Sequence, residues 1–138
     1  MSMSAGDLCL EIVRLAKSAG LPTDVLPADH MTPGAESLWI EPWGHDGYFA
    51  LRYCERGSIS EVVIGQADEV IFESLRQAAF SLASRRELEN RRLGEDSRRQ
   101  LFEIEEDLMA RIRPEWSERV RQQNALTLEQ HPFRDVGA

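Results

Sequence analysis

Apolar residues near the start of the chain recur every three or four positions, which is the period of one face of a helix. The residues on this face are Leu8, Ile12, Leu15 and Ala19. Ser4 stands where an N-cap belongs, and Gly20 stands where the helix can end. The pattern therefore predicts an amphipathic N-terminal helix that ends at Gly20.

The middle of the chain alternates short apolar runs with turn signals. The runs rich in β-branched and aromatic residues occupy residues 38–40, 48–53 and 59–64. The segments between them contain the glycines that tight hairpin connections need for positive φ. These segments predict a three-stranded antiparallel meander. It follows a connector, residues 21–36, in which three prolines interrupt regular structure.

Helical periodicity returns in the second half. Residues 67–92 contain neither Gly nor Pro, and one of their faces is apolar. That face contains Ile71, Leu75, Ala78 and Leu82, with Phe72 and Phe80 beside it. A second stripe follows at Leu101, Ile104, Leu108 and Ile112. Pro114 then starts a helix that carries Trp116, Val120, Ala125 and Leu126.

These elements predict the fold class. Three strands alone bury too little apolar area, and the helix over residues 67–92 can cover one face of the sheet. We expect an α+β fold with an N-terminal helix, a three-stranded antiparallel meander, and an antiparallel array of helices covering it. Because no repeat or linker divides the 138 residues, we expect one domain over residues 1–138.

The charge of the chain restricts its partners. Twenty-four acidic residues against sixteen basic ones give a net charge of −8. This balance argues against nucleic acid, whose binding depends on Lys and Arg, and favours a basic protein partner. Arginines between residues 85 and 99 alternate with acids, which favours ion pairs within the chain.

The N-terminus and the hydropathy pattern bear on location. The first residues lack the basic region of a signal peptide, and charged residues interrupt the apolar segment that follows. No stretch is apolar enough for a membrane span. We therefore expect a cytoplasmic protein that does not enter the membrane.

Catalytic and metal-binding patterns are not found. The three histidines are dispersed at positions 30, 45 and 131, so none has the spacing of a metal site. No nucleophile motif or phosphate-binding glycine loop occurs. Cys9 and Cys54 are expected to be buried free thiols. We expect no cofactor, no metal and no enzymatic activity, and an enzyme is the poorer alternative.

Six residues are candidates for binding a partner. Glu103, Glu106 and Asp107 lie on the predicted helix away from its apolar stripe. They form a solvated face or a partner-binding patch, with catalytic carboxylates the least favoured interpretation. The other candidates are Glu41, Trp43 and Asp46. Trp39 is expected in the core, whereas Trp43 lies next to a turn and is the better exposed anchor.

Several motifs in the second half share their order and spacing with a known family. They are Arg98-Arg99-Gln100-Leu101-Phe102, Pro114-Glu115-Trp116-Ser117-Glu118-Arg119 and His131-Pro132-Phe133, preceded by Phe80-Ser81-Leu82-Ala83 and the segment from Tyr48 to Gly57. Together they indicate paired helices and a docked tail. Over residues 48–135 the chain resembles the bacterial polymorphic-toxin immunity family known as immunity protein 63. It departs from the pattern at Arg113, where Asn is expected, and at Arg134 in the tail.

The resemblance implies a small cytoplasmic protein, made beside a secreted toxin, that binds the toxin domain and blocks it. The partner would be a cognate, basic toxin domain, and nucleases are one such class. The alternative function is an effector adaptor or secretion chaperone that binds the toxin without inhibiting it. A homodimer formed through the helices is also compatible with the sequence.

Overall fold

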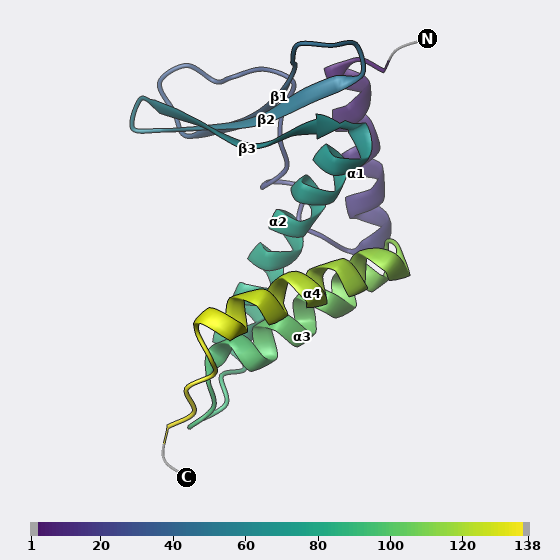
Figure 1. Cartoon of the computed structure of the whole chain (residues 1–138). Helices are drawn as coiled ribbons and strands as arrows, with labels where there is room; N and C mark the ends of the chain where they lie inside the picture. The colour runs from purple at the N-terminus through teal and green to yellow at the C-terminus, as the bar shows by residue number, and fades with distance from the viewer. Residues whose placement is uncertain (1–2, 137–138) are drawn as a thin grey trace.

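The computed structural model describes residues 3–136 and confirms the predicted α+β fold. Its elements in chain order are α1 (Ala5–Ala19), β1 (Ser37–Pro42), β2 (Tyr48–Glu55), β3 (Ser58–Gln66), α2 (Ala67–Glu89), α3 (Ser97–Ala110) and α4 (Pro114–Gln130). Figure 1 shows the sheet at one end, the α3–α4 pair at the other, and α2 running between them.

The N-terminal helix has the predicted ends. The backbone N–H of Asp7 donates to the Ser4 hydroxyl over 3.0 Å, and the Asp7 carboxylate accepts from the Ser4 N–H over 3.1 Å. This reciprocal capping box satisfies two N–H groups that the first turn would leave unpaired. Gly20 ends the helix at a φ of 75°, a left-handed conformation that costs glycine little. Leu8 and Ile12 are fully buried.

The sheet is an antiparallel meander in the order β1-β2-β3. The β2–β3 turn places Arg56 at a φ of 52° and Gly57 at 78°, as a type I′ hairpin turn requires. The outer edge of β1 is covered by the connector. There the Ala28 N–H donates to the Leu38 carbonyl and the Ile40 N–H donates to the Ala28 carbonyl, over 3.0 and 2.9 Å.

Only one face of the sheet contributes to the main core. Ile40, Phe49 and Leu51 are buried on this inner face and belong to the same apolar cluster as residues of α1 and α2. The N-terminal half of α2 packs on β2 and β3, and α1 packs on β1 and α2. The cover that three strands need is therefore supplied by α1 and α2.

The α3–α4 pair packs against α2. Phe72 on α2 and Trp116 on α4 meet edge to face, with ring centroids 5.6 Å apart. The predicted start of α4 at Pro114 is confirmed, and the preceding Arg113 makes no side-chain cap. Its guanidinium carbon instead lies 4.5 Å from the centroid of the Trp116 ring. At the N-cap position of α4, Arg113 therefore makes a cation–π contact and no side-chain cap.

Some expectations from the apolar pattern are wrong. Phe80 on α2 and Leu126 on α4 are 49% and 62% exposed. The helices packed against α2 and α4 cover a narrower face of each than the apolar pattern indicates. The helix predicted to end at residue 92 ends at Glu89. Cys9 and Cys54 are free, as expected, but both are partly exposed rather than buried.

The predicted pairing of arginines with interleaved acids is confirmed. The Glu87 carboxylate accepts from Arg91 over 2.8 Å at i, i+4. Arg92 and Glu95 pair over 3.3 Å at i, i+3. These pairs engage Arg91 and Arg92 at the junction of α2 and α3 within the chain.

Trp116→Ala should destabilise the protein by about 3–5 kcal/mol, because it leaves a cavity beside Phe72 in a closely packed core. Leu126→Ala is the matched control on the same helix, and its effect should stay within about 0.5 kcal/mol. Urea unfolding followed by circular dichroism measures both. Equal losses for the two variants would contradict the placement of Trp116 in the core.

Candidate partner-binding site

The outer face of the sheet, opposite to the helices, carries an ordered grid of side chains. The strand register places four rows across it: Trp43–Tyr48–Gln66, Glu41–Ala50–Ile64, Trp39–Arg52–Glu61 and Ser37–Cys54–Ile59. Trp43 joins its row through its backbone N–H, which donates to the Tyr48 carbonyl over 3.0 Å. The alternation of side chains along strands puts all these residues on one face. We call this set the outer-face grid.

Arg52 is the centre of the outer-face grid. Its guanidinium donates to Glu41 over 2.9 Å and to Glu61 over 3.3 Å. Its guanidinium carbon also lies 5.8 Å from the Trp39 ring centroid and 5.1 Å from the Trp43 ring centroid. The cation therefore links the two neighbouring strands and fixes both indoles through contacts that favour Arg over Lys.

Trp39 is buried, as expected, at 4% exposure, but it lies on the outer face beneath Arg52 and outside the main apolar cluster. Trp43 is 39% exposed, as the sequence predicts. Beside Trp43 the grid also exposes Tyr48 and, in the next row, Ile64, whereas the exposed Ile59 lies in the row at the opposite end of the grid. An aromatic anchor with neighbouring apolar side chains, rimmed by acids, has the composition of a protein-binding hot spot.

The six predicted partner-binding residues do not form one surface. Glu41 and Trp43 belong to the outer-face grid, and Asp46 is exposed in the turn between β1 and β2. Glu103, Glu106 and Asp107 lie on α3, which packs against α2 and α4. The layer of α1 and α2 lies between these two sets (Figure 1).

The α3 acids do not all point outward. Glu103 and Asp107 are exposed, as expected, but Glu106 is half-buried. Its carboxylate accepts from the Asn124 side chain over 3.3 Å, because α4 packs along this side of α3. The expectation that all three acids are solvent-exposed is therefore wrong for Glu106.

The sequence analysis missed a buried polar cluster between α2, α3 and α4. Glu105, 1% exposed, accepts from Asn124 over 3.1 Å and lies 3.6 Å from the Arg76 guanidinium. Arg76 also donates to Gln123. Burial raises the pKa of Glu105 despite these partners. Glu105 follows Leu101 by four residues and precedes Leu108 by three, and this spacing is the sequence signal for an inward carboxylate.

A cleft opens beside this cluster. It encloses about 440 Å³ and is lined by Glu73, Arg76, Gln77, Phe80 and Glu105. The carboxylate of Glu105 beside the cleft is hydrogen-bonded to Asn124 and paired with Arg76, and Phe80 is exposed at the cleft.

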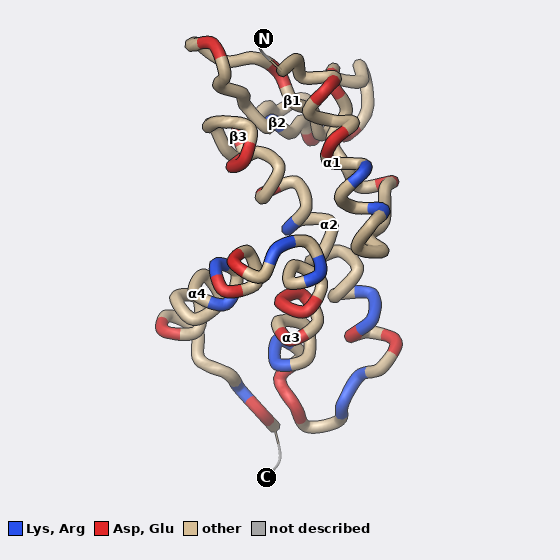
Figure 2. The backbone as a smooth tube through the Cα atoms, turned by 90° about the vertical axis from the view of Figure 1, so that its right-hand side faces the viewer, with Lys and Arg blue, Asp and Glu red and all other residues tan. Residues whose placement is uncertain are grey.

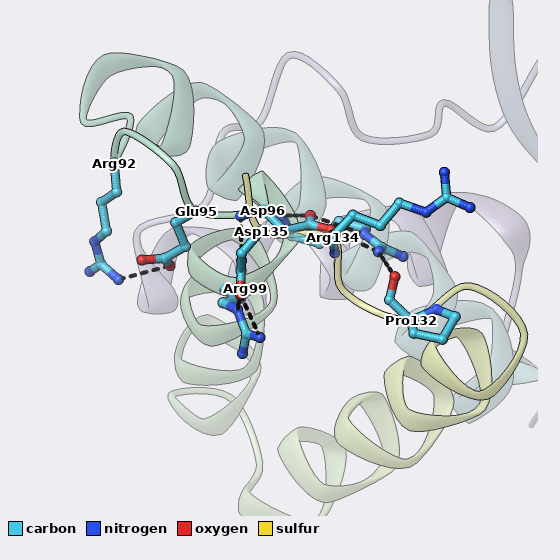
Figure 3. A network of polar contacts seen from close by, with 8 residues as sticks. Arg92, Glu95, Asp96, Arg99, Pro132, Arg134 and Asp135 are labelled. Atoms are coloured by element: carbon cyan, nitrogen blue, oxygen red, sulfur yellow. Dashed lines mark hydrogen bonds and ion pairs between the residues drawn. The ribbon is translucent and has the colours of Figure 1, made fainter. Parts of the chain in front are cut away.

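The C-terminal tail is docked, as the motifs indicate. In Figure 3, Asp135 accepts from the Asp96 N–H over 2.8 Å and pairs with Arg99 over 2.9 Å. In return, the Asp96 carboxylate accepts from the Arg134 N–H over 2.8 Å and caps α3 at the Arg98 N–H. We call this reciprocal arrangement the tail latch.

Backbone and ring contacts extend the tail latch. Arg98 donates to the His131 and Pro132 carbonyls over 2.8 and 2.9 Å. The guanidinium carbon of Arg99 lies 4.1 Å from the Phe133 ring centroid. The Arg98 guanidinium, with the Arg134 and Arg98 backbone N–H groups, holds the pKa of Asp96 well below its usual range. The latch thus pairs Arg98 and Arg99 with carboxylates and carbonyls of the same chain.

The distribution of charge distinguishes the two ends of the molecule. Residues 1–66 contain nine acids and four bases, and residues 67–138 contain fifteen acids and twelve bases. Figure 2 shows basic positions gathered around α3, α4 and the loop before α3, whereas acids predominate around the sheet. The outer-face grid therefore lies in the more acidic part of the protein.

Neither a metal-binding cluster nor a membrane-spanning helix is found among the described residues. Over residues 3–136, no group of three or more His, Cys, Asp or Glu side chains is placed to hold a metal ion. None of the described helices combines the length and apolar character that crossing a membrane requires.

Comparison with known protein families gives a match. The model of the family described as Immunity protein 63 matches residues 46–125, more than half of the chain. This match includes β2, β3, α2, α3 and most of α4. No curated protein and no solved structure matches the chain.

Acid should weaken the tail latch. The folded-state pKa values of Asp96 and Asp135 are lowered by Arg98 and Arg99, so the native state binds fewer protons than the unfolded state. The stability they provide is present above the ordinary aspartate value of 3.8 and is lost as the pH falls below it. The melting temperature measured from pH 7 to pH 2.5 should fall less steeply in Asp96→Asn/Asp135→Asn than in the parent. Asp107→Asn, an exposed carboxylate on α3, should keep the parental slope.

Glu105 should have the opposite pH dependence. Because burial raises its folded pKa above the ordinary value of 4.5, the native state binds more protons, and stability declines as the pH rises through the raised pKa. Glu105→Gln keeps an acceptor for Asn124 and removes the buried charge. The difference in unfolding free energy between this variant and the parent, measured with urea, should be about 1 kcal/mol more favourable to the variant at pH 8 than at pH 4.5. Glu103→Gln, at an exposed position of the same helix, is the control. If Glu105→Gln is instead less stable than the parent at pH 8, the ion pair with Arg76 contributes more than the desolvation of Glu105 costs.

Proposed function

This chain belongs to the immunity protein 63 family, and we propose that it binds and neutralises a cognate bacterial toxin domain. The proposal rests on the family together with one structural observation, the outer-face grid. That surface exposes Trp43, Tyr48 and Ile64 opposite the face that α1 and α2 cover. Exposed apolar groups gathered on one face are characteristic of protein-interaction sites.

The proposed interface has Trp43 at its centre, with Glu41 and Asp46 supplying negative charge nearby. Arg52 holds the Trp43 ring in place before binding, which reduces the side-chain entropy lost on association. An acidic rim accelerates encounter with a basic partner and disfavours an acidic one. Glu103, Glu106 and Asp107 are the rival patch on α3.

The chemistry of the partner follows from this charge. A protein of net charge −8 associates most readily with a cationic domain. Nucleases fit this description, because they bind phosphates through Lys and Arg. The protein would act by occupying or covering the toxin surface, and this role needs no catalytic group of its own.

Co-expression with the toxin domain encoded beside this chain tests the function. The parent should restore growth, and the purified pair should form a complex in which the toxin is inactive. A stable complex with an active toxin would instead favour the effector adaptor or secretion chaperone. Absence of both binding and protection would contradict both binding functions.

Trp43→Ala should weaken toxin binding about thirtyfold, the factor that corresponds to the roughly 2 kcal/mol of a hot-spot residue. Its melting temperature should stay near that of the parent, because Trp43 is already exposed. Glu103→Lys/Asp107→Lys is the matched test of the rival α3 patch. Isothermal titration calorimetry at two salt concentrations measures both. A large loss of affinity in the α3 variant alone would place the toxin interface on α3 instead of on the outer-face grid.

A further inference from the structure

The free edge of β3 is a feature of the sheet that is separate from the outer-face grid. β3 pairs with β2 on one side, and among the described residues no strand pairs with its other side. Seven of its nine residues are exposed. An unpaired edge presents a row of backbone N–H and carbonyl groups that can accept another strand.

The two edges of the sheet differ in whether their backbone groups are covered. The edge of β1 is closed by Ala28, whose backbone exchanges two hydrogen bonds with Leu38 and Ile40, and β1 ends in Pro42. Such covering and prolines are the usual protection of sheet edges. Because β1 has this protection and β3 does not, the open edge is specific to β3.

The sequence of β3 favours pairing. Its residues, Ser-Ile-Ser-Glu-Val-Val-Ile-Gly-Gln, include four β-branched apolar side chains and neither Pro nor Lys. The one charged residue, Glu61, is engaged by Arg52 on the neighbouring strand. Such a segment adopts and extends β-structure readily.

A bulge interrupts β3 without closing it. The register with β2 shifts between Leu51 and Arg52, which leaves Val62 as the extra residue. On each side of the bulge the pairing is regular, over residues 58–61 and 63–66. A bulge increases the local twist, and each flanking stretch still offers backbone groups to a strand that follows this twist.

We propose that the free edge of β3 receives an extended segment of the toxin domain as a fourth strand of the sheet. This proposal rests on the proposed function and specifies how the toxin is bound. The main chain of the segment would pair with β3, and its alternate side chains would extend the outer-face grid beside Ile59 and Ile64. Strand addition of this kind combines backbone affinity with side-chain selection.

The segment is basic as well as apolar. The strands and turns over residues 36–66 carry Glu36, Glu41, Asp46, Glu55 and Glu61 against Arg52 and Arg56, and Arg52 is already paired with two of the acids. A second copy of this chain is a poorer occupant, because it also carries a net charge of −8 and would bring like charges to the same edge. The charge therefore selects a toxin segment that alternates β-branched residues with Lys or Arg.

Amide hydrogen exchange of the complex tests this geometry directly. The probe is the toxin domain encoded beside this chain, inactivated in its own active site, at saturating concentration. Amides of β3 with outward-facing N–H groups should exchange at least tenfold more slowly in the complex, whereas Trp39 and Ile40 on the covered β1 should change little. Neutralisation with unchanged β3 exchange would overturn the strand addition and leave the immunity function standing. Failure of the toxin to bind at all would overturn both.

Substitutions at Ile64 test the chemistry of the segment. Ile64 is 47% exposed, so replacements should leave the melting temperature near that of the parent. Ile64→Lys should weaken binding at least tenfold, because a lysine on an edge strand repels a basic segment. Ile64→Glu should retain more affinity than Ile64→Lys, and equal losses would contradict a basic segment.

Two controls complete the test. Leu88→Lys introduces the same charge at an exposed position of α2, 65% exposed and distant in sequence from the sheet, and should bind as the parent does. Sedimentation of the free protein tests the alternative occupant. A dimer that dissociates on Ile64→Lys substitution would assign the edge to a second copy and overturn the proposal.

Discussion

The helix α2 has to bury two different surfaces along its length, and the other elements are arranged around that requirement. Its first half closes the inner face of the sheet, and it also packs against the α3–α4 pair. Phe72 is fully buried against Trp116 of α4, and Arg119 bridges its ring to Glu69 with a guanidinium carbon 4.0 Å from the ring centroid. Because the same helix serves both surfaces, loss of either contact removes support from the other, which favours cooperative unfolding.

One-sided cover of the sheet has a direct consequence for function. Helices that fill the inner face cannot also reach the outer face, so the outer-face grid depends on its own side chains for order. The Arg52 contacts supply that order. Exposed ion pairs and cation–π contacts contribute little to stability one at a time, but together they restrict Arg52 and the two indoles to one arrangement. We infer that their main effect is preorganisation of the Trp43 surface.

The apolar pattern predicts the elements well, because helix and strand periods depend on which residues meet the core. The capping box at Ser4 and the hairpin glycines are local signals, and the structure has them where the sequence places them. Leu126 and Phe80 were misleading because pattern alone does not say how much of a helix its neighbours cover. Asn124 is buried where an apolar residue would be expected, since Glu105 on α3 provides its acceptor. That pairing joins residues 19 positions apart, and no local pattern identifies it. The centre of the grid was missed for the same reason, because the role of Arg52 depends on strand register.

The limits of the family match divide the proposed interface in an informative way. The match begins at residue 46, so β2 and β3 lie inside it, whereas Glu41 and Trp43 precede it. Main-chain pairing at the β3 edge depends on backbone groups and tolerates many side chains. Discrimination between partners depends on side chains that a wrong partner leaves unpaired or clashes with. On this division, we propose that the matched part of the chain would hold an extended toxin segment through its main chain. The Trp43 surface, fixed by Arg52, would then select one toxin.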